Sequence, residues 1–235
     1  ARDVPDSVPV FPLSAALLLP GGRMPLNIFE PRYLEMVDHA LSHQRLIGMI
    51  QPQDETAQAA LCKTGCAGRI VSFSETDDGR YLITLKGVAR FNLPEGAAAH
   101  AEGYLTGRPD WVPYRADLKP DTVTDICRDT MVGTLHAYFK KMGMSCDQWE
   151  QIRQIGCEKL VATLSVVCPF EAHEKQALLE APDLAARARL LHGLLEAAVR
   201  ENCGNGCGSG RDHGRIVSHF RLGCGCQQNV GPIGK

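Results

Sequence analysis

The chain has no long apolar run. A transmembrane helix needs about 18 or more consecutive apolar residues, and the longest candidate, residues 8–19, is interrupted by Pro9 and Pro12. Residues 1–6 also lack the basic segment and apolar core of a secretory signal. We therefore expect a cytoplasmic protein with no membrane-spanning segment and no membrane partner.

The chain also has little net charge. Its 25 Lys and Arg residues nearly balance 27 Asp and Glu residues, which gives a net charge of −2. Proteins that bind nucleic acids through their phosphates usually carry a clear basic excess, so we expect no nucleic-acid partner. Hydrophobic residues make up 44% of the chain and charged residues 22%, a composition typical of a globular protein.

The loops that mark common catalytic classes are missing too. A Gly-x4-Gly-Lys-Ser/Thr loop would place backbone N–H groups around phosphates. The nearest match, Lys63-Thr64, follows Cys62 and has no such loop. No Gly-x-Ser-x-Gly segment, which would present a nucleophilic serine, occurs either. We therefore predict that the chain is not an enzyme and has no catalytic residues.

Residues 1–117 have the pattern of a β-rich unit. The clearest signal is a hairpin, in which residues 68–74 and 81–86 are rich in β-forming residues. Between them, Asp78-Gly79 can adopt the positive φ angles of a tight turn. Gly87 predicts a bulge or bend in the second strand.

One helix is expected inside this β-rich half. Asn27 and Glu30 have the spacing of a capping box, which predicts a helix that runs to about Leu41, although Pro31 favours a start one or two residues later. Leu34, Val37 and Leu41 would then lie on its buried face. The alternative, that residues 27–33 form part of a binding surface, stays open.

Residues 118–200 change to a helical period. The expected helices cover Thr122–Met142, Asp147–Ile155, Cys157–Val167, Glu171–Glu180 and a last segment from Asp183 onward. Short connections between helices favour an antiparallel bundle. The sequence thus predicts an α+β protein with an N-terminal β-rich half and a C-terminal antiparallel helical bundle.

Residues 201–235 form a Gly- and Cys-rich tail with almost no apolar period. Four cysteines, Cys203, Cys207, Cys224 and Cys226, could supply the thiolates of one Zn²⁺ site. Their C-x3-C and C-x-C spacings are not those of the common zinc knuckle. A disordered tail and disulfide bonds remain the alternatives. We expect no cofactor other than a possible Zn²⁺ ion in this tail.

Other Cys and His pairs have plainer interpretations. Cys62 and Cys66 form a C-x3-C pair with no second pair nearby, which favours independent structural cysteines. His39 and His43 have a spacing that suits a metal, but no third ligand is close in the sequence. We interpret them as part of a solvated helix face.

Three segments resemble one family. The first comprises 8–13, 19–22 and 24–33, which includes Ile28-Phe29-Glu30-Pro31-Arg32-Tyr33. The second comprises 65–70 and Gly87-Val88-Ala89-Arg90-Phe91, and the third Cys168-Pro169-Phe170 and 174–180. In this order they resemble the Lon protease N-terminal domain over about residues 7–200. The resemblance implies a PUA-like pseudobarrel followed by a helical bundle.

The resemblance also implies a function. In full-length Lon this domain captures unfolded or tagged proteins, and an ATPase and a Ser–Lys peptidase follow it. This chain has no counterpart of either catalytic module. We therefore expect a stand-alone substrate-recognition domain that binds unfolded or degron-bearing proteins without ATP and delivers them to a separate protease. The alternative is a cysteine- or metal-dependent hydrolase that uses the additional Cys and His residues.

Four residues are the candidates for protein binding. Arg32 and Tyr33 belong to the most specific segment of the resemblance, and Arg32 is expected to be exposed. Trp111 and Tyr114 lie near the junction of the two predicted halves, where clefts often bind ligands. For both aromatic residues, packing inside the protein is the competing interpretation.

Overall fold

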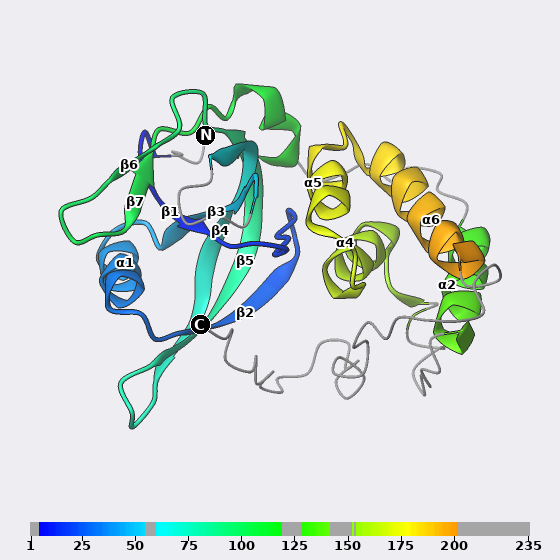
Figure 1. Ribbon diagram of the computed structural model, residues 1–235, viewed down its shortest axis with the longest axis horizontal. Coiled ribbons are helices and arrows are strands. Elements are labelled where there is room, and N and C mark those ends of the chain that lie inside the picture. The colour runs from blue at the N-terminus through cyan, green and yellow to red at the C-terminus, as the bar shows by residue number, and fades with distance from the viewer. Residues whose placement is uncertain (1–4, 55–59, 119–127, 142–151, 153, 202–235) are drawn as a thin grey trace. The chain divides into compact units, whose positions relative to one another are not determined.

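The computed structural model combines one mixed β-sheet with helices and describes residues 5–54, 60–118, 128–141, 152 and 154–201 (Figure 1). This α+β composition confirms the predicted fold class in its coarse form. The predicted cysteine tail, 201–235, lies outside the described residues except for Glu201. In the described part of the chain, no helix combines the length and the apolar character needed to cross a bilayer.

The chain folds into two compact units. Unit 1 comprises Ala1–Thr122 and Ala162–Ala181, and unit 2 comprises Val123–Val161 and Pro182–Lys235. The contacts therefore group residues 162–181 with the β-rich part, whereas the sequence pattern alone placed them in the helical half. The predicted boundaries at 117 and 200 stay predictions.

Unit 1 is built on a seven-stranded sheet with the order β2-β5-β4-β3-β1-β7-β6. The strands are β1 (Val8–Pro12), β2 (Arg23–Ile28), β3 (Leu46–Pro52), β4 (Leu61–Glu75), β5 (Tyr81–Asn92), β6 (Ala97–Ala99) and β7 (Leu105–Gly107). Strands β1 and β3 pair in parallel, and the other neighbours pair antiparallel. Prolines at 9, 12 and 25 lie in β1 and β2, and β2 is an edge strand, where a missing N–H is tolerated.

The predicted hairpin is confirmed in β4 and β5. Gly79 has a φ of 78° in the turn, and its N–H donates to the Thr76 carbonyl oxygen at 2.9 Å. The predicted irregularity at Gly87 is confirmed as well, because the register shifts from Ala67 opposite Ala89 to Gly68 opposite Gly87. A Cβ atom on Gly87 would lie 2.0 Å from the Leu19 carbonyl oxygen, so only glycine lets the β1–β2 connection cross here.

The helix after β2 begins later than the capping-box pattern predicts. Helix α1 (Pro31–Ser42) starts with a proline in its first turn, and its N-cap residue, Glu30, makes no side-chain capping bond. Asn27 belongs to β2 instead, opposite Leu82. Proline suits the first helical position because its fixed φ is helical and no N–H is needed there. The predicted capping box is therefore wrong.

The buried face of α1 also differs from the predicted one. It consists of Tyr33, Met36, Val37 and Ala40, of which the sequence pattern identified only Val37. This face covers the sheet next to β1 and β3. The predicted Leu34 and Leu41 lie at the edge of this face and are only partly buried.

The C-terminal helices form where local signals predicted them. The structure contains α4 (Cys157–Val167), α5 (Ala172–Glu180) and α6 (Leu184–Glu201). Glu171 and Glu174 form a capping box at the start of α5, and Asp183 accepts a hydrogen bond from the Ala186 N–H at 2.7 Å at the start of α6. The predicted helix over 147–155 lies largely outside the described residues.

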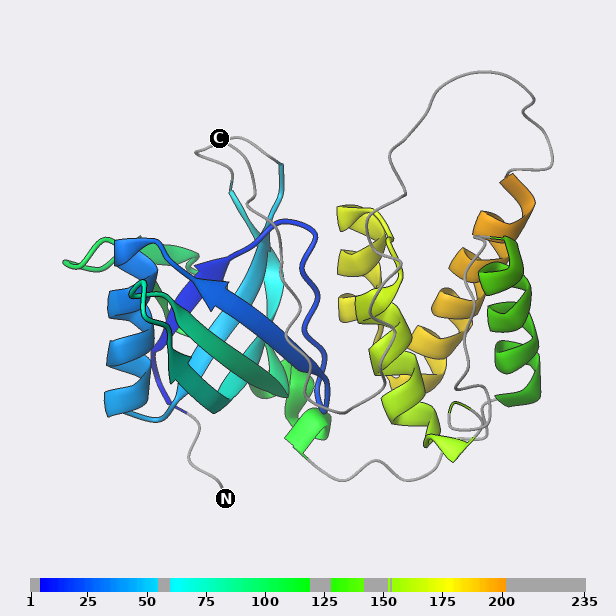
Figure 2. The same ribbon diagram turned by 90° about the horizontal axis from the view of Figure 1, so that it is seen from below.

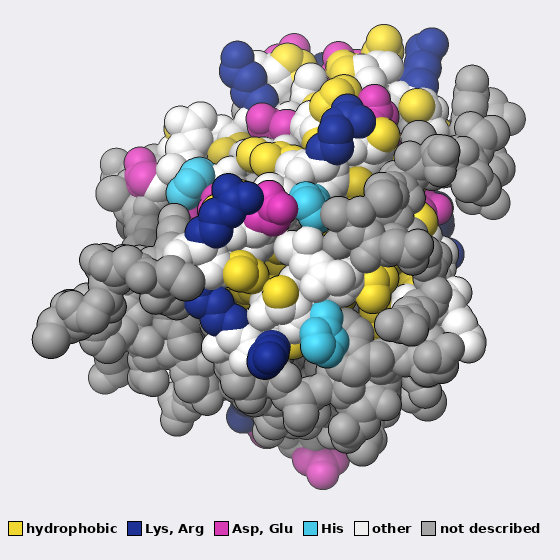
Figure 3. Space-filling model, turned by 90° about the vertical axis from the view of Figure 1, so that its right-hand side faces the viewer, with side chains coloured by type: hydrophobic (Ala, Val, Ile, Leu, Met, Phe, Trp, Pro, Cys, Tyr) yellow, Lys and Arg dark blue, Asp and Glu magenta, His cyan; other side chains and the backbone are white. Residues whose placement is uncertain are grey.

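In unit 2, α2 (Arg128–Lys141) packs against α6. Leu135, Leu191 and Leu195 are fully buried. The Thr134 hydroxyl lies 2.9 Å from Nε2 of His192, and Lys141 Nζ donates to the Ala198 carbonyl at 3.0 Å. Figure 3 shows acidic, basic and apolar side chains interspersed on the face seen there, with no field of one charge sign among the coloured residues.

Candidate functional site

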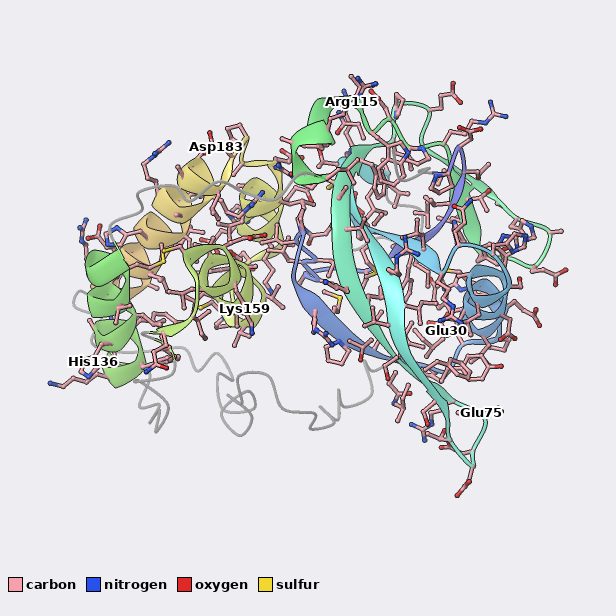
Figure 4. All side chains as sticks on the ribbon, turned by 180° about the vertical axis from the view of Figure 1, so that it is seen from behind. Glu30, Glu75, Arg115, His136, Lys159 and Asp183 are labelled. Atoms are coloured by element: carbon pink, nitrogen blue, oxygen red, sulfur yellow. The ribbon has the colours of Figure 1, made fainter. Side chains whose placement is uncertain are left out.

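Exposed apolar side chains lie around the outer part of the β4–β5 hairpin, which projects from the sheet with Glu75 near its tip (Figures 2 and 4). Phe29 is 55% exposed, and Val71 and Phe73 are each 42% exposed. Large apolar side chains are usually buried. Several exposed ones in the same region therefore indicate a surface that contacts another molecule. We call Phe29, Val71, Phe73 and Tyr81 the hairpin patch.

Strand pairing brings the members of the hairpin patch to one region. Tyr81 lies opposite both Ile28 of β2 and Glu75 of β4, so Phe29, which follows Ile28, comes beside the end of the hairpin that carries the turn. The rings of Phe73 and Tyr81 meet edge to face with centroids 5.0 Å apart. Val71 lies at a register irregularity between Ile70 and Ser72, which disturbs the alternation of buried and exposed positions.

Tyr81 ties the hairpin to helix α1. Its hydroxyl donates to Asp38 Oδ2 at 3.3 Å. Partial desolvation raises the pKa of Tyr81, and the carboxylates of Asp38, Glu75 and Glu35 raise it further. Tyr81 therefore stays neutral and keeps its proton for this bond at physiological pH.

The tip of the hairpin is polar and charged. Asp78 pairs with Arg80 at 2.7 Å, and both side chains are half exposed. A hydrogen bond from the Thr76 hydroxyl, aided by Arg80, lowers the pKa of Asp78. The hairpin patch thus has a charged rim at one end, a common arrangement around apolar contact surfaces.

The structure separates the roles of Arg32 and Tyr33. Arg32 is exposed, forms an ion pair with Glu30 at 2.8 Å, and places its guanidinium 4.5 Å from the centre of the Tyr33 ring. Tyr33 is buried and packs on Phe11 with ring centroids 4.4 Å apart. Burial raises the pKa of Tyr33 against the opposing effect of Arg32. Arg32 is therefore accessible to a partner, whereas Tyr33 supports α1 on the sheet.

Trp111 and Tyr114 both make packing contacts within unit 1. The Trp111 indole N–H donates to the Pro5 carbonyl at 3.2 Å, and its ring packs against Phe91 with centroids 5.7 Å apart. Tyr114 belongs to the 3-10 segment η1 (Val112–Leu118) and lies under the guanidinium of Arg90, 4.4 Å away. These contacts support the packing interpretation of both residues.

Arg90 is a central contact that the sequence pattern did not single out. Its side chain is 3% exposed, and Nε and Nη2 each donate to the carboxylate of Asp117 at 2.8 Å. Its Nη1 donates to the carbonyls of Leu179, at 3.0 Å, and Ala181 at the end of α5. Burial alone would lower the pKa of Arg90, but its hydrogen bonds and charge interaction with Asp117 outweigh this effect, so the pKa of Arg90 is raised. Arg90 therefore joins β5, η1 and α5 within unit 1.

A second polar network attaches α5 to the sheet. The Gln51 side chain is 2% exposed and donates to the Ala172 carbonyl and to Gln176 Oε1, at 3.2 and 3.1 Å. Gln176 in turn donates to the Thr64 carbonyl at 3.2 Å. Helix α5 is thus held to unit 1 at both ends, which explains its place in that unit.

Two cysteines of the described chain, Cys62 and Cys168, do not have the surroundings of a nucleophile. Like Cys66 and Cys157, they are not joined in a disulfide. Burial raises the pKa of Cys168 to about 12. The pKa of Cys62 is also raised, by burial and then by Glu180. A reactive thiol needs a lowered pKa, so these two thiols do not favour a cysteine hydrolase.

Metal ligands do not gather in the described residues. Within 5–54, 60–118, 128–141, 152 and 154–201, no group of three or more His, Cys, Asp or Glu side chains is placed to hold a metal ion. The predicted zinc ligands Cys203, Cys207, Cys224 and Cys226 lie outside the described residues, so nothing in the structure supports the zinc prediction.

Residues 7–197 match the family described as the ATP-dependent protease La (LON) substrate-binding domain. The chain belongs to this family. The chain is 26% identical over 200 residues to Lon protease 2 of Sorangium cellulosum, a match that covers 79% of this chain and 24% of the relative. It is 29% identical over 199 residues to the Lon protease of Parabacteroides distasonis, which covers 80% of this chain and 24% of the relative.

Solved structures of Lon N-terminal domains have a similar fold. The Lon N-terminal domain protein from Xanthomonas campestris has a TM-score of 0.57 and 22% identity, covering 81% of this chain and 97% of that one. The N-terminal domain of Mycobacterium avium complex Lon protease has a TM-score of 0.55 and 16% identity, with coverages of 81% and 98%. This Lon substrate-binding domain spans about a quarter of the length of the curated relatives it matches.

The segments that resemble Lon have identifiable structural roles in this Lon substrate-binding domain. Residues 28–33 carry the chain from β2 into α1 and expose Phe29 and Arg32. Residues 87–91 combine the close approach at Gly87 with the buried Arg90. The exposed Val71 and Phe73 were missed, and their alternation with Ser72 and Ser74 was the available signal.

Proposed function

We propose that this Lon substrate-binding domain binds exposed apolar segments of unfolded or degron-bearing proteins through the hairpin patch. The observation that carries the proposal is the exposure of Phe29, Val71 and Phe73 on a projecting hairpin. The family supports substrate recognition in general, and the hairpin patch holds three of the large exposed apolar side chains of the described residues. Arg32 would contribute a cation at its border.

Binding through the hairpin patch needs no nucleotide, because its driving force is the removal of apolar surface from water. Full burial of one large apolar side chain contributes about 1.5–3 kcal/mol. Phe29 and Phe73 are roughly half exposed already, so each would contribute about half of that. Because these contributions are small and association has its own cost, the expected affinity is modest, about micromolar at best.

We further propose that captured proteins pass to a separate protease and that the protein works in the cytoplasm. The finer architecture, a PUA-like pseudobarrel followed by an antiparallel helical bundle, is proposed likewise. The pairing of β1 with β3 and β7 supports the first part, and the packing of α2 on α6 supports the second. No observation favours the alternative hydrolase.

The test is an anisotropy titration of a fluorescently labelled, permanently unfolded protein with the full chain, without ATP. The folded form of the same labelled protein is the comparison. We expect saturable binding of the unfolded form only, and Phe29→Ser and Phe73→Ser should each weaken it about tenfold, the effect of about 1.4 kcal/mol.

Val112→Ser is the matched control, because Val112 is 59% exposed but lies in η1, at the other end of the sheet from the hairpin turn (Figure 4). It should leave the affinity unchanged. Equal binding of the folded protein, or equal losses in Val112→Ser and Phe73→Ser, would overturn the assignment of the hairpin patch.

A further inference from the structure

Three histidine side chains from separate parts of unit 1 meet beside α1. His39 and His43, one helical turn apart on α1, stack with ring centroids 4.2 Å apart and an interplanar angle of 19°. His100, which follows β6, approaches His39 with a centroid distance of 5.7 Å. His100 also stacks on the buried Tyr104 at 4.4 Å. We call His39, His43 and His100 the histidine cluster.

The histidine cluster adds His100 to the two histidines that were interpreted as part of a solvated helix face. His43 is exposed, but His39 is half-buried. The turn between β6 and β7 lies beside α1 in Figures 1 and 2. His100 supplies a long-range contact that sequence spacing could not reveal. The cluster is the direct contact between the end of α1 and this turn.

Hydrogen-bonding groups surround Nδ1 on two of the rings. Nδ1 of His43 lies 2.8 Å from the His39 carbonyl oxygen and 3.0 Å from the Ser42 hydroxyl. Nδ1 of His100 accepts from the Glu102 N–H at 3.3 Å, so it carries none. A proton added at this nitrogen would place two N–H groups against each other and remove this bond, which lies inside the turn.

Besides burial, the groups that shift the pKa of His39 are His43 and His100, and no carboxylate is among them. The β6–β7 turn contributes Glu102 and Tyr104, and burial, then Glu102 and Glu35 of α1, raise the pKa of Tyr104. Asp38 of α1 accepts a hydrogen bond from Tyr81. A hollow of about 90 Å³ borders His39 and His43 on another side. Its remaining lining residues, Pro5, Ser7, Val8, Pro9, Ala40, Gln44 and Leu46, carry no ionisable side chain.

We propose that the histidine cluster is an acid-sensitive latch that holds the β6–β7 turn to α1. The latch is closed while the rings are neutral and stacked. It opens as they take up protons, because like charges then face each other at ring-contact distance. This function does not depend on the proposed binding of unfolded proteins.

The direction of the pH dependence follows from His39. Burial, then His43 and His100, lower the pKa of His39 in the folded protein. The open state therefore binds more protons than the closed state, so closure weakens as the pH falls below about 6.5, the ordinary value for histidine. Each proton excluded from the closed state changes the closing equilibrium by up to about tenfold per pH unit.

The test is hydrogen–deuterium exchange of the full chain at several pH values from 7.5 to 5.5, with rates corrected for intrinsic exchange. Protection of residues 97–107 should fall by up to about tenfold per pH unit below about pH 6.5. His39→Asn and His100→Phe should flatten this dependence, and the phenylalanine keeps a ring on Tyr104. The slope with pH is the readout, because loss of stacking alone changes protection equally at every pH.

His173→Asn is the matched control, because His173 is exposed on α5, and it should keep the wild-type slope. A flat profile in the wild-type protein, or a wild-type slope in both cluster variants, would overturn the latch. If a cluster variant does not fold, NMR titration of the wild-type imidazoles decides the matter. A His39 ring that titrates at or above about pH 6.5 would then contradict the proposal.

Discussion

Replacing Asp117 with Asn tests the contribution of the buried Arg90–Asp117 pair. The substitution keeps the size of the side chain but removes its charge and turns one acceptor into a donor that faces Arg90. Arg90 is 3% exposed, and arginine does not lose its proton in proteins, so the variant retains a buried charge without its counterion. Removing one partner of a buried ion pair typically costs about 3–5 kcal/mol.

The measurement is urea unfolding, followed by the fluorescence of Trp111 in a Trp149→Phe background, because the chain has two tryptophans. Trp111 packs on the core of unit 1, so its signal reports on that unit. With a slope of about 2 kcal/mol per M urea, the midpoint should fall by about 2 M. Glu30→Gln, which removes the exposed pair with Arg32, should cost less than about 1 kcal/mol.

Two results would refute this reasoning. The first is an Asp117→Asn midpoint equal to that of Glu30→Gln, which would mean that burial adds nothing to the pair. The second is full recovery of stability in Arg90→Met combined with Asp117→Leu. Arg90 also donates to the Leu179 and Ala181 carbonyls, and a methionine leaves both without this donor, so we expect only partial recovery.

Two further predictions concern positions away from the ion pair. Gly87→Ala should destabilise the protein by about 1–3 kcal/mol, because its Cβ would lie 2.0 Å from the Leu19 carbonyl oxygen; a thermal melt that matches wild type would contradict the crossing described at Gly87. Cys168 should resist iodoacetamide in the native protein at pH 8, since burial raises its pKa to about 12; rapid labelling by mass spectrometry at that pH would show that the site opens to solvent.

Local signals predicted the elements whose geometry is decided within a few residues. Asp78-Gly79 was sufficient for the hairpin turn, because the positive φ of 78° at Gly79 is a local requirement. The start of α5 was likewise predictable from Glu171, which caps the helix together with Glu174. By contrast, Pro31 and not Asn27 determines where α1 begins, since Asn27 is taken up by pairing with β5.

The features that sequence reasoning missed depend on contacts between distant residues. Arg90 and Asp117 are 27 positions apart, and nothing local indicates that either is buried. His100 joins His39 only because β6 and β7 place their connecting turn beside α1. The hairpin patch could be predicted only in part. Arg32 at its border was correctly expected to be exposed. The exposure of Phe29 and Phe73 depends on how the hairpin projects from the sheet, which the sequence does not show.

The composition of unit 1 from two chain segments has a consequence for biosynthesis. Arg90 leaves the ribosome well before its last partners, because the Leu179 carbonyl lies 89 positions later. At about 5–20 residues per second, the guanidinium waits roughly 4–18 s for the helix that accepts its hydrogen bonds. During that interval the nascent sheet lacks α5, so the guanidinium of Arg90 has water in place of the Leu179 and Ala181 carbonyls until residue 181 has emerged.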